Sequence, residues 1–315
     1  MTTSADLRGH PSGSTVEKAE PQGWKPSFLA SLTALLMVAG LAILSYPAVA
    51  SWFSQREQSR IISDYAEQVD DAVPAARQQI EAAHAYNEAL DAGAVLGANE
   101  RLPMGSGSLG ADPLTADPLT SDVLDYETLL SVNSSGLMGR IKIPAIGVDL
   151  PIYHGTSDAT LLKGVGHLEG TSLPVGGDST HSVLTAHRGL ADATMFTNLD
   201  KVELGDRFTV EVFGEVATYR IVSTRVVDPA DTESLGVVRD EDLVTLVTCT
   251  PLGINSQRIL VTGARVTPTP RADLENAGAA PDIPGFPWWA VWICVGVTAV
   301  GSYVWWSGRP ARKPE

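Results

Sequence analysis

The sequence predicts a mainly β domain at residues 137–268, folded as a barrel or a sandwich. Short runs of β-branched and aromatic residues alternate there with Gly, Pro, Asp and Asn, which is the pattern of strands joined by turns. No succession of strands and long helices is present, so a parallel α/β sheet is not expected. The expected strands are Arg140–Ile143, Val183–Thr185, Arg207–Val212, Thr218–Val227, Leu243–Thr248 and Ile259–Val266.

The N-terminal segment is expected to anchor the chain in a membrane. Residues 1–27 are polar and are interpreted as a cytoplasmic tail. Residues 28–50 are interpreted as a transmembrane anchor, because Phe28–Val49 carries no charge and is long enough to cross a bilayer. A cleaved signal peptide is the alternative, since Ala48-Val49-Ala50 resembles a signal-peptidase site. On either interpretation, the residues that follow are exported.

Residues 51–92 are expected to form an extracytoplasmic helical region, with a linker and lid loop at residues 93–136. Apolar residues recur at roughly helical spacing between Glu57 and Asp91, and Pro74 is expected to kink or divide the helix. The recurring residues are Ile62, Tyr65, Val69, Ala76, Ile80, Ala83 and Leu90. The linker is rich in Gly, Ser and Pro, and long irregular loops of this kind often serve as lids.

The C-terminal region predicts a return to the membrane. Residues 269–285 are interpreted as a tether, and residues 286–306 as a second transmembrane helix with Trp near both ends. Basic residues in the tail 307–315 place the C-terminus in the cytoplasm by the positive-inside rule. With two spans, both termini are then cytoplasmic and residues 51–285 are extracellular.

Composition excludes several functions. The formal net charge is −15, so the chain repels phosphate backbones and no nucleic-acid partner is expected. The chain has two cysteines, Cys249 and Cys294, and Cys294 lies in the second apolar run, so no disulfide framework is expected. Metal-ligand spacing, a P-loop and a dinucleotide fingerprint are missing from the sequence, so no metal or cofactor is expected.

Three residues at expected strand ends are candidates for chemistry. Cys249 follows the apolar run Leu243–Thr248, and a thiol held there becomes a nucleophile when a base or cation lies nearby. His187 ends another strand-like run, and Arg258 opens the strand after Cys249, where its donors can stabilise an oxyanion. A structural histidine and a surface arginine remain the alternatives. His154 and His167 lie in Gly-rich turns and suit hydrogen bonding within loops.

These motifs closely resemble the sortase family. The similarity lies in TLVTCTP (245–251), INSQRILVTG (254–263) and HSVLTAHRGL (181–190), and extends through MGRIKIPAIGVDLPIYHGT (138–156), GVGHLEGTSLPVGG (164–177) and MFTNLDKVELGD (195–206). It covers most of residues 137–266. The motifs, the second membrane span and the Asp-Pro loop before the domain together resemble the pilin-polymerising branch, class C.

The resemblance implies a closed β-barrel of about eight strands with short helices, and a cysteine transpeptidase of Gram-positive cell surfaces. It implies that Cys249 is the nucleophile, His187 the acid/base and Arg258 the stabiliser of substrate and oxyanion. The family cleaves an LPxTG-like sorting signal between Thr and Gly through a thioester. In class C the acceptor is a pilin lysine, so the partners are pilin subunits and the product is a covalent pilus.

Other functions remain open at the level of the sequence. The same residues serve a sortase that anchors surface proteins to a cell-wall peptidoglycan amine. They also serve a cysteine endopeptidase. A non-catalytic, membrane-tethered binding module explains the anchors and the acidic surface, although it gives no reason for the three strand-end residues.

The expected lid departs from the family pattern. Pilin sortases typically place Asp-Pro-aromatic over the active site, whereas this chain has Asp-Pro-Leu twice. Asp117 and Leu119 are the expected lid residues, with Asp112 and Leu114 as the alternative register. Because leucine has less area than an aromatic ring, a weaker cover over the thiol is expected.

Overall fold

A computed structural model describes residues 24–71, 73–91, 125–131, 135–281 and 284–309. The chain divides into two compact units, of which the larger comprises residues 45–289. The smaller unit comprises the residues up to Leu44 together with those from Ala290 onward.

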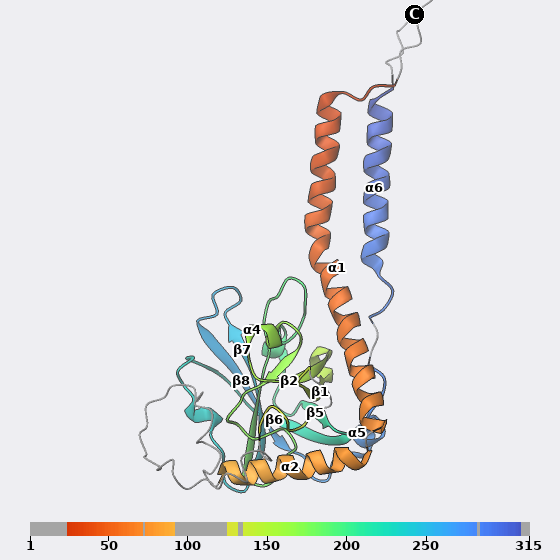
Figure 1. The fold of residues 1–315 in the computed structure, drawn as a ribbon. Helices are drawn as coiled ribbons and strands as arrows, with labels where there is room; N and C mark the ends of the chain where they lie inside the picture. The colour runs from red at the N-terminus through yellow and green to blue at the C-terminus, as the bar shows by residue number, and fades with distance from the viewer. Residues whose placement is uncertain (1–23, 72, 92–124, 132–134, 282–283, 310–315) are drawn as a thin grey trace, which may run out of the picture. The chain divides into compact units, whose positions relative to one another are not determined.

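The larger unit contains a closed barrel, which decides between the expected barrel and sandwich (Figure 1). In the described residues eight strands form it, in the order β1-β2-β3-β4-β7-β8-β6-β5. Pairs β2–β3 and β4–β7 are parallel, and the other pairs are antiparallel. The strands are β1 (Leu137–Ile143), β2 (Val148–His154), β3 (Val165–His167), β4 (Thr180–Thr185), β5 (Arg207–Val212), β6 (Glu215–Val227), β7 (Asp242–Thr250) and β8 (Gln257–Arg265).

Two of these strands, β2 and β3, were not expected from the sequence. β2 contains Pro151, which cannot donate a ladder hydrogen bond, and it ends at His154. β3 is three residues long and contains Gly166. A Cβ on Gly166 would collide with the Gly155 carbonyl, so glycine is required where these segments approach each other. Close packing of the backbone, rather than β propensity, accounts for these two strands.

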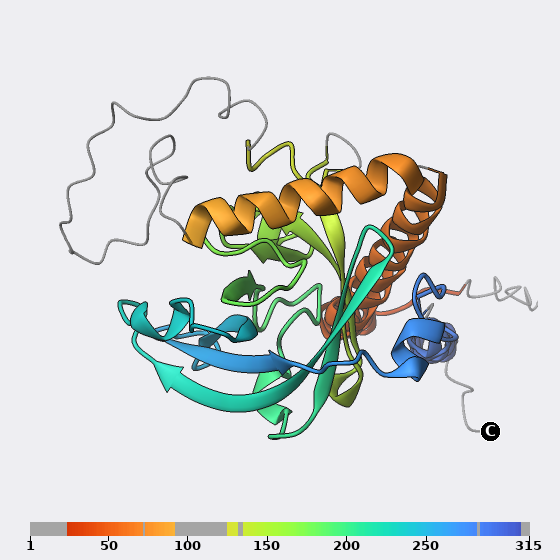
Figure 2. The ribbon, with the colours of Figure 1, turned by 90° about the horizontal axis from the view of Figure 1, so that it is seen from below.

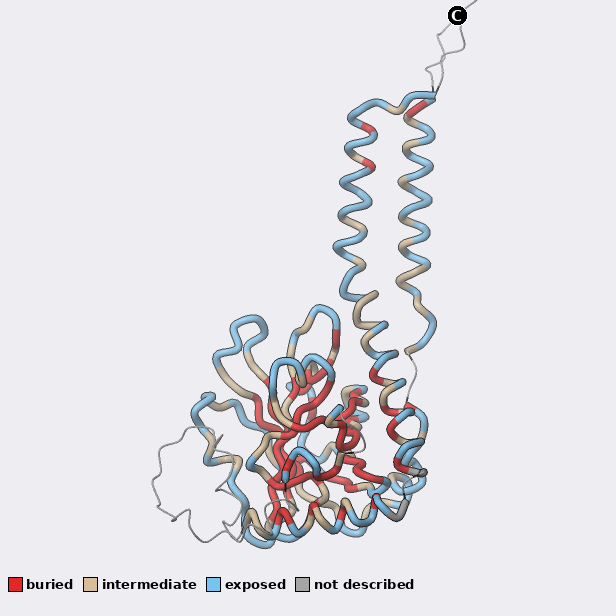
Figure 3. Tube along the Cα trace, in the orientation of Figure 1, coloured by how far each residue is buried: buried red, intermediate tan, exposed pale blue. Residues whose placement is uncertain are grey.

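Apolar side chains of the strands fill the interior of the barrel, and Figure 3 shows much of the barrel strands coloured as buried. Phe208 of β5 and Tyr219 of β6 stack there with ring centroids 5.4 Å apart. Gly263 of β8 lies against both, because a Cβ at that position would be 2.7 Å from Phe208 Cζ. Burying such aromatic rings contributes a large share of the apolar area that stabilises the domain.

Helices α1 (Phe28–Asp71) and α2 (Val73–Asp91) precede the barrel. α1 runs through the expected membrane span and into the expected helical region, and α2 forms the rest of that region, so the helix divides close to Pro74, as expected. α2 lies across one end of the barrel (Figure 2) and contributes Ile80, Ala83 and Tyr86 to the barrel core. Its Asn87 amide pairs with both the N–H and the carbonyl of Leu173, at 2.7 and 3.0 Å.

The remaining elements are short, apart from the last helix. They are η1 (Pro144–Ile146), α4 (Asp158–Leu161), η2 (Leu199–Lys201), η3 (Glu233–Leu235), α5 (Arg271–Glu275) and α6 (Trp288–Ser307). By length and composition alone, α1 and α6 are apolar enough to cross a membrane. Within the smaller unit the two helices approach closely, since a Cβ on Gly296 would be 2.7 Å from Leu41 Cδ2.

Candidate active site

Cys249 and Arg258 lie on neighbouring antiparallel strands as direct partners. β7 carries Cys249 one residue before its end, and β8 carries Arg258 at its second position. Directly opposed residues of an antiparallel pair point to the same face, with Cβ atoms about 4.5–5.5 Å apart. The β7–β8 hairpin therefore holds the thiol and the guanidinium side by side.

His187 extends the same row on the other side of Cys249. β4 runs parallel to β7, with Thr185 opposite Val247. Beyond the strand the ladder continues, because the Ala186 N–H donates to the Val247 carbonyl at 3.2 Å and the Thr248 hydroxyl donates to the Ala186 carbonyl at 2.8 Å. Continuing that register by one residue places His187 beside Cys249. The three candidate residues thus form one row, with Cys249 on β7, Arg258 on β8 and His187 two residues past the end of β4.

This row lies on the outer face of the barrel. Leu246 and Thr248 are almost fully buried, and Leu246 joins the interior core. Val247 instead packs with Val183 and Leu260 in a separate cluster, so the alternate positions of β7 point outward. We call this cluster, with its flanking residues, the outer-face patch. Its members are Val183, Val247 and Leu260, with Leu168, Val227 and Leu235 packed against them.

The Arg258 guanidinium is oriented by its own hairpin. Its Nη1 donates to the carbonyls of Asn255 and Gln257, both at 3.0 Å. Arginine has five N–H donors, so those on Nε and Nη2 remain. Neither Nε nor Nη2 is hydrogen-bonded to any residue that the structure describes. A fixed guanidinium with uncommitted donors beside a thiol suits stabilisation of an oxyanion.

The His187 ring is half-buried, and within the described ranges no side chain hydrogen-bonds to it. Its backbone is fixed, since the His187 carbonyl accepts from Phe196 N–H at 3.1 Å. Two other histidines, His154 and His167, have structural hydrogen bonds instead. His154 and His167 end strands β2 and β3 rather than lying in turns, and both are hydrogen-bonded to backbone carbonyls. Burial lowers the pKa of His167 to about 4.

Two features near the site were not identified from the sequence. One is the Thr248 hydroxyl bond that ties β7 to the end of β4. The other is Arg188, whose side chain is only 7% exposed. Its position directly after His187 was visible in the sequence, but burial of an arginine cannot be read from composition. The expected lid residues Asp112, Leu114, Asp117 and Leu119 lie outside the described residues.

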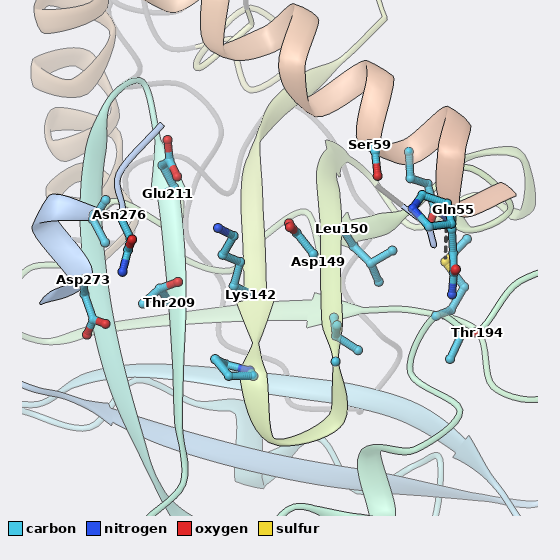
Figure 4. A pocket seen from close by; sticks show the side chains of 17 residues that line it. Gln55, Ser59, Lys142, Asp149, Leu150, Thr194, Thr209, Glu211, Asp273 and Asn276 are labelled. Atoms are coloured by element: carbon cyan, nitrogen blue, oxygen red, sulfur yellow. Dashed lines mark hydrogen bonds between the residues drawn. The ribbon is translucent and has the colours of Figure 1, made fainter. Parts of the chain in front are cut away.

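A separate cavity of about 510 Å³ lies on another part of the barrel (Figure 4). It is lined by α1, by the β1–β2 hairpin and by residues near α5, and none of the three candidate residues lines it. Lys142 and Asp149 face it from neighbouring strands (Figure 4). Within the described residues, no cluster of His, Cys, Asp and Glu is arranged to hold a metal ion.

The closed barrel holds a thiol between an imidazole and a guanidinium. These features define the class of protein: a β-barrel protein with a cysteine-centred site. Residues 141–266 match the family model described as the sortase domain. The chain belongs to the sortase family, and its structural neighbours include class C sortases. Sortases are cysteine transpeptidases that are associated with the membrane and have an extracellular catalytic domain.

Individual relatives are 35–38% identical to this chain over the aligned residues. Sortase C1 of Streptococcus agalactiae is 38% identical, with a TM-score of 0.55, covering 67% of this chain and 100% of that one. Clostridium perfringens sortase C, solved with the C-terminal cell wall sorting motif, is 38% identical, with a TM-score of 0.54 and coverages of 66% and 98%. Sortase D of Bacillus subtilis is 35% identical over 41% of this chain, and the match spans 64% of that protein.

Proposed function

We propose that this chain is a cysteine transpeptidase that cleaves an LPxTG-like sorting signal between Thr and Gly and transfers the acyl group to a pilin lysine. The observation that carries the proposal is the single row formed by His187, Cys249 and Arg258. Such a row supplies a nucleophile, a proton carrier and an oxyanion donor at one place on a rigid sheet. The class C neighbours support the pilin acceptor.

In the acylation step, Cys249 Sγ gives its proton to His187 and attacks the carbonyl carbon of the signal's Thr. The developing oxyanion accepts hydrogen bonds from the uncommitted Nε and Nη2 donors of Arg258. His187 gives a proton to the departing glycine amine as the carbon–nitrogen bond breaks. A thioester between Cys249 and the Thr acyl group results, and the glycine-bearing fragment leaves as a free amine.

In the transfer step, the ε-amine of a lysine attacks the thioester carbonyl. His187 accepts the proton that the amine loses and passes it to Cys249 Sγ as the carbon–sulfur bond breaks, which restores the Cys249 thiol. The product is an isopeptide bond. Because the thioester retains the reactivity of the acyl group, the transfer needs no nucleotide outside the cell.

The outer-face patch adjoins the row. Val183, Val247 and Leu260 are buried, so its partly exposed flanking residues Leu168, Val227 and Leu235 are assigned to contact with the apolar part of the signal. The sorting motif named with the Clostridium perfringens structure supports a substrate of this kind. Asp117 and Leu119, or Asp112 and Leu114 in the other register, are proposed as the lid that limits access of water to the thioester.

The proposed location follows from the two apolar helices and from the family. The barrel acts outside the cell, α1 and α6 anchor it, and both termini are cytoplasmic. Such an arrangement keeps the thioester close to substrates that emerge from the same membrane. Attachment of proteins to a cell-wall amine is the second candidate, because the same row serves either acceptor.

Mass spectrometry of the full chain in detergent micelles tests the proposal. The protein is mixed with an LPxTG peptide and then with a lysine-bearing pilin domain, using Cys249→Ala and Cys294→Ala as matched thiol variants. We expect a peptide adduct on Cys249 and then an isopeptide product, both retained in Cys294→Ala and lost in Cys249→Ala. An adduct released only by wall-type amines identifies the anchoring function. If no adduct forms even after removal of residues 93–122, the catalytic assignment of Cys249 is wrong and a non-catalytic binding module is favoured.

A further inference from the structure

Arg188 joins three segments of the chain next to the candidate row. Its guanidinium is nearly buried, and each of its nitrogens contacts a different partner. Nε donates to the Thr197 carbonyl at 3.1 Å, Nη1 donates to the Thr250 hydroxyl at 2.9 Å, and Nη2 lies 2.7 Å from Asp200 Oδ2. Arg188 directly follows His187 and Thr250 directly follows Cys249, so the bond between them links the neighbours of the two candidate residues.

These contacts matter because β4 ends before His187. The last strand residue of β4 is Thr185, so the ladder fixes Ala186 but not the residues beyond it. Thr250 is still inside β7 and directly follows Cys249. The bond from Arg188 to Thr250 therefore extends the connection between the two strands past the end of the ladder, and it spans the pair formed by His187 and Cys249.

The residue after Arg188 is also held closely. The Gly189 N–H donates to the Thr197 hydroxyl at 3.0 Å. Gly189 has a φ of +77°, and a Cβ there would collide with the Leu252 side chain, so the loop lies directly against the β7–β8 loop. The backbone around His187 is thus restrained on both sides, whereas its ring has no side-chain hydrogen bond among the described residues.

We propose that Arg188 is a positioning residue that holds the His187 imidazole at the distance and angle from Cys249 Sγ that proton transfer requires. The inference rests on the proposed function, because it assigns Arg188 a role only through His187. Arg188 does not touch the substrate in this mechanism. Misplacing a catalytic group by about 1 Å can reduce a rate about 100-fold, so such a restraint has a measurable effect.

Arginine suits this role and lysine does not. A planar guanidinium donates in three fixed directions at once, as the contacts to Thr197, Thr250 and Asp200 require. A lysine ammonium at the same position keeps the charge and can satisfy Asp200, but it cannot hold all three partners in this geometry. Arg188→Lys therefore separates loss of positioning from loss of charge.

The experiment measures alkylation of Cys249 by iodoacetamide, which requires no knowledge of the natural substrate. All proteins are full-length, in detergent micelles and in a Cys294→Ala background, so that one thiol reacts. The variants are Arg188→Lys, Thr250→Val, His187→Ala and the double variant Arg188→Lys/His187→Ala. Arg140→Lys is the matched control, because Arg140 is also a buried arginine with a close carboxylate partner, Asp149 at 2.6 Å.

We expect His187→Ala and Arg188→Lys each to slow alkylation about tenfold or more, and Thr250→Val to slow it by a smaller factor. The double variant should react no more than about twofold more slowly than His187→Ala alone, since two residues that act as a unit are not additive. Arg140→Lys should lower the thermal midpoint and leave the alkylation rate of the folded protein unchanged. With an LPxTG peptide, Arg188→Lys should lower kcat and leave KM within about twofold.

Three outcomes overturn the inference. If Arg188→Lys lowers the thermal midpoint and leaves the alkylation rate unchanged, as Arg140→Lys does, Arg188 has a structural role only. Effects of Arg188→Lys and His187→Ala that multiply in the double variant show that Arg188 acts independently of the imidazole. A normal alkylation rate in His187→Ala removes the role of His187 itself, and thus contradicts the proposed mechanism rather than the contacts of Arg188 alone.

Discussion

Cys249 and Arg258 are direct partners in the antiparallel β7–β8 pair, so the thiol and the guanidinium are separated by one strand spacing. Their relative position follows from backbone hydrogen bonds rather than from contacts between the side chains. Only the hairpin loop between β7 and β8 separates them along the chain. Cys249 and Arg258 are therefore held in place as rigidly as the sheet itself.

Replacing Arg258 tests its role as an oxyanion donor. Arg258→Lys keeps the charge but loses the planar donors on Nε and Nη2, and we expect thioester formation to slow by about 100-fold, as for other lost oxyanion donors. Single-turnover acylation with an LPxTG peptide measures this rate. Arg220→Lys, at an exposed position of β6, is the control and should retain the parental rate. Equal rates for both variants and the parent would exclude Arg258 from the chemistry.

Stability should fall in mild acid because of His167. Burial lowers its folded-state pKa from an ordinary 6.5 to about 4, so between these values the unfolded chain binds the proton and the folded chain does not. The contribution is therefore intact above pH 6.5 and is lost as the pH falls toward 4, by about 3 kcal/mol in total. Urea unfolding at several pH values measures it.

The variant His167→Gln serves as the comparison for that measurement. A glutamine amide can donate to the Ser172 carbonyl and accept from the Tyr126 hydroxyl, as the neutral ring does at 2.9 Å in both contacts. We expect its stability to depend less steeply on pH between 6.5 and 4. Burial also lowers the pKa of His181, and that residue is unchanged in both proteins. An identical slope in the two proteins contradicts the assignment to His167.

Gly263 should tolerate no side chain. The added methyl of Gly263→Ala would lie 2.7 Å from Phe208 Cζ and 3.0 Å from Tyr219 Cβ, so the stacked rings must move. We expect a loss of about 1–3 kcal/mol, the usual range for overpacking of a core. Gly236→Ala is the matched control, because its added methyl would meet nothing closer than 3.5 Å. Thermal unfolding of both variants measures the difference, and equal midpoints would contradict the packing argument.

Asn87 should be important for docking of α2. Asn87→Ala leaves the buried Leu173 N–H without its side-chain partner, at a cost of about 1–3 kcal/mol, whereas the Leu173 carbonyl still accepts from the Val175 N–H at 2.8 Å. Hydrogen exchange should then increase across α2. Glu88→Ala, at the neighbouring exposed position, should change stability by less than about 0.5 kcal/mol. Unchanged exchange in Asn87→Ala would show that apolar contacts alone hold the helix.

The long strands could be predicted from the sequence because their residues have strong β propensity. β5 and β7 agree with the expected runs within two residues at each end. β2 and β3 were missed because Pro151 and Gly166 oppose that propensity, and the strands exist only through pairing with their neighbours. The division between α1 and α2 could be predicted because Pro74 lies at the second position of α2, where its missing N–H is tolerated.

The candidate site could be predicted only in part. Cys249 and Arg258 are consecutive in the strand pattern, so a hairpin was expected to bring them together. The proximity of His187 depends on the parallel pairing of β4 with β7, which are far apart in sequence and whose adjacency no local pattern reveals. Arg188 was overlooked for a related reason, since its partners Thr197, Thr250 and Asp200 meet only in the folded chain.

The attachment of α2 has a consequence for the integrity of the molecule. Tyr86 of α2 lies against Tyr126, with ring centroids 6.4 Å apart, and Gln79 accepts from the Leu130 N–H at 2.7 Å. The chain on both sides of residues 92–124 is therefore fastened to the same body by non-covalent contacts. A protease that nicks the chain between those limits should yield two polypeptides that migrate together until they are denatured.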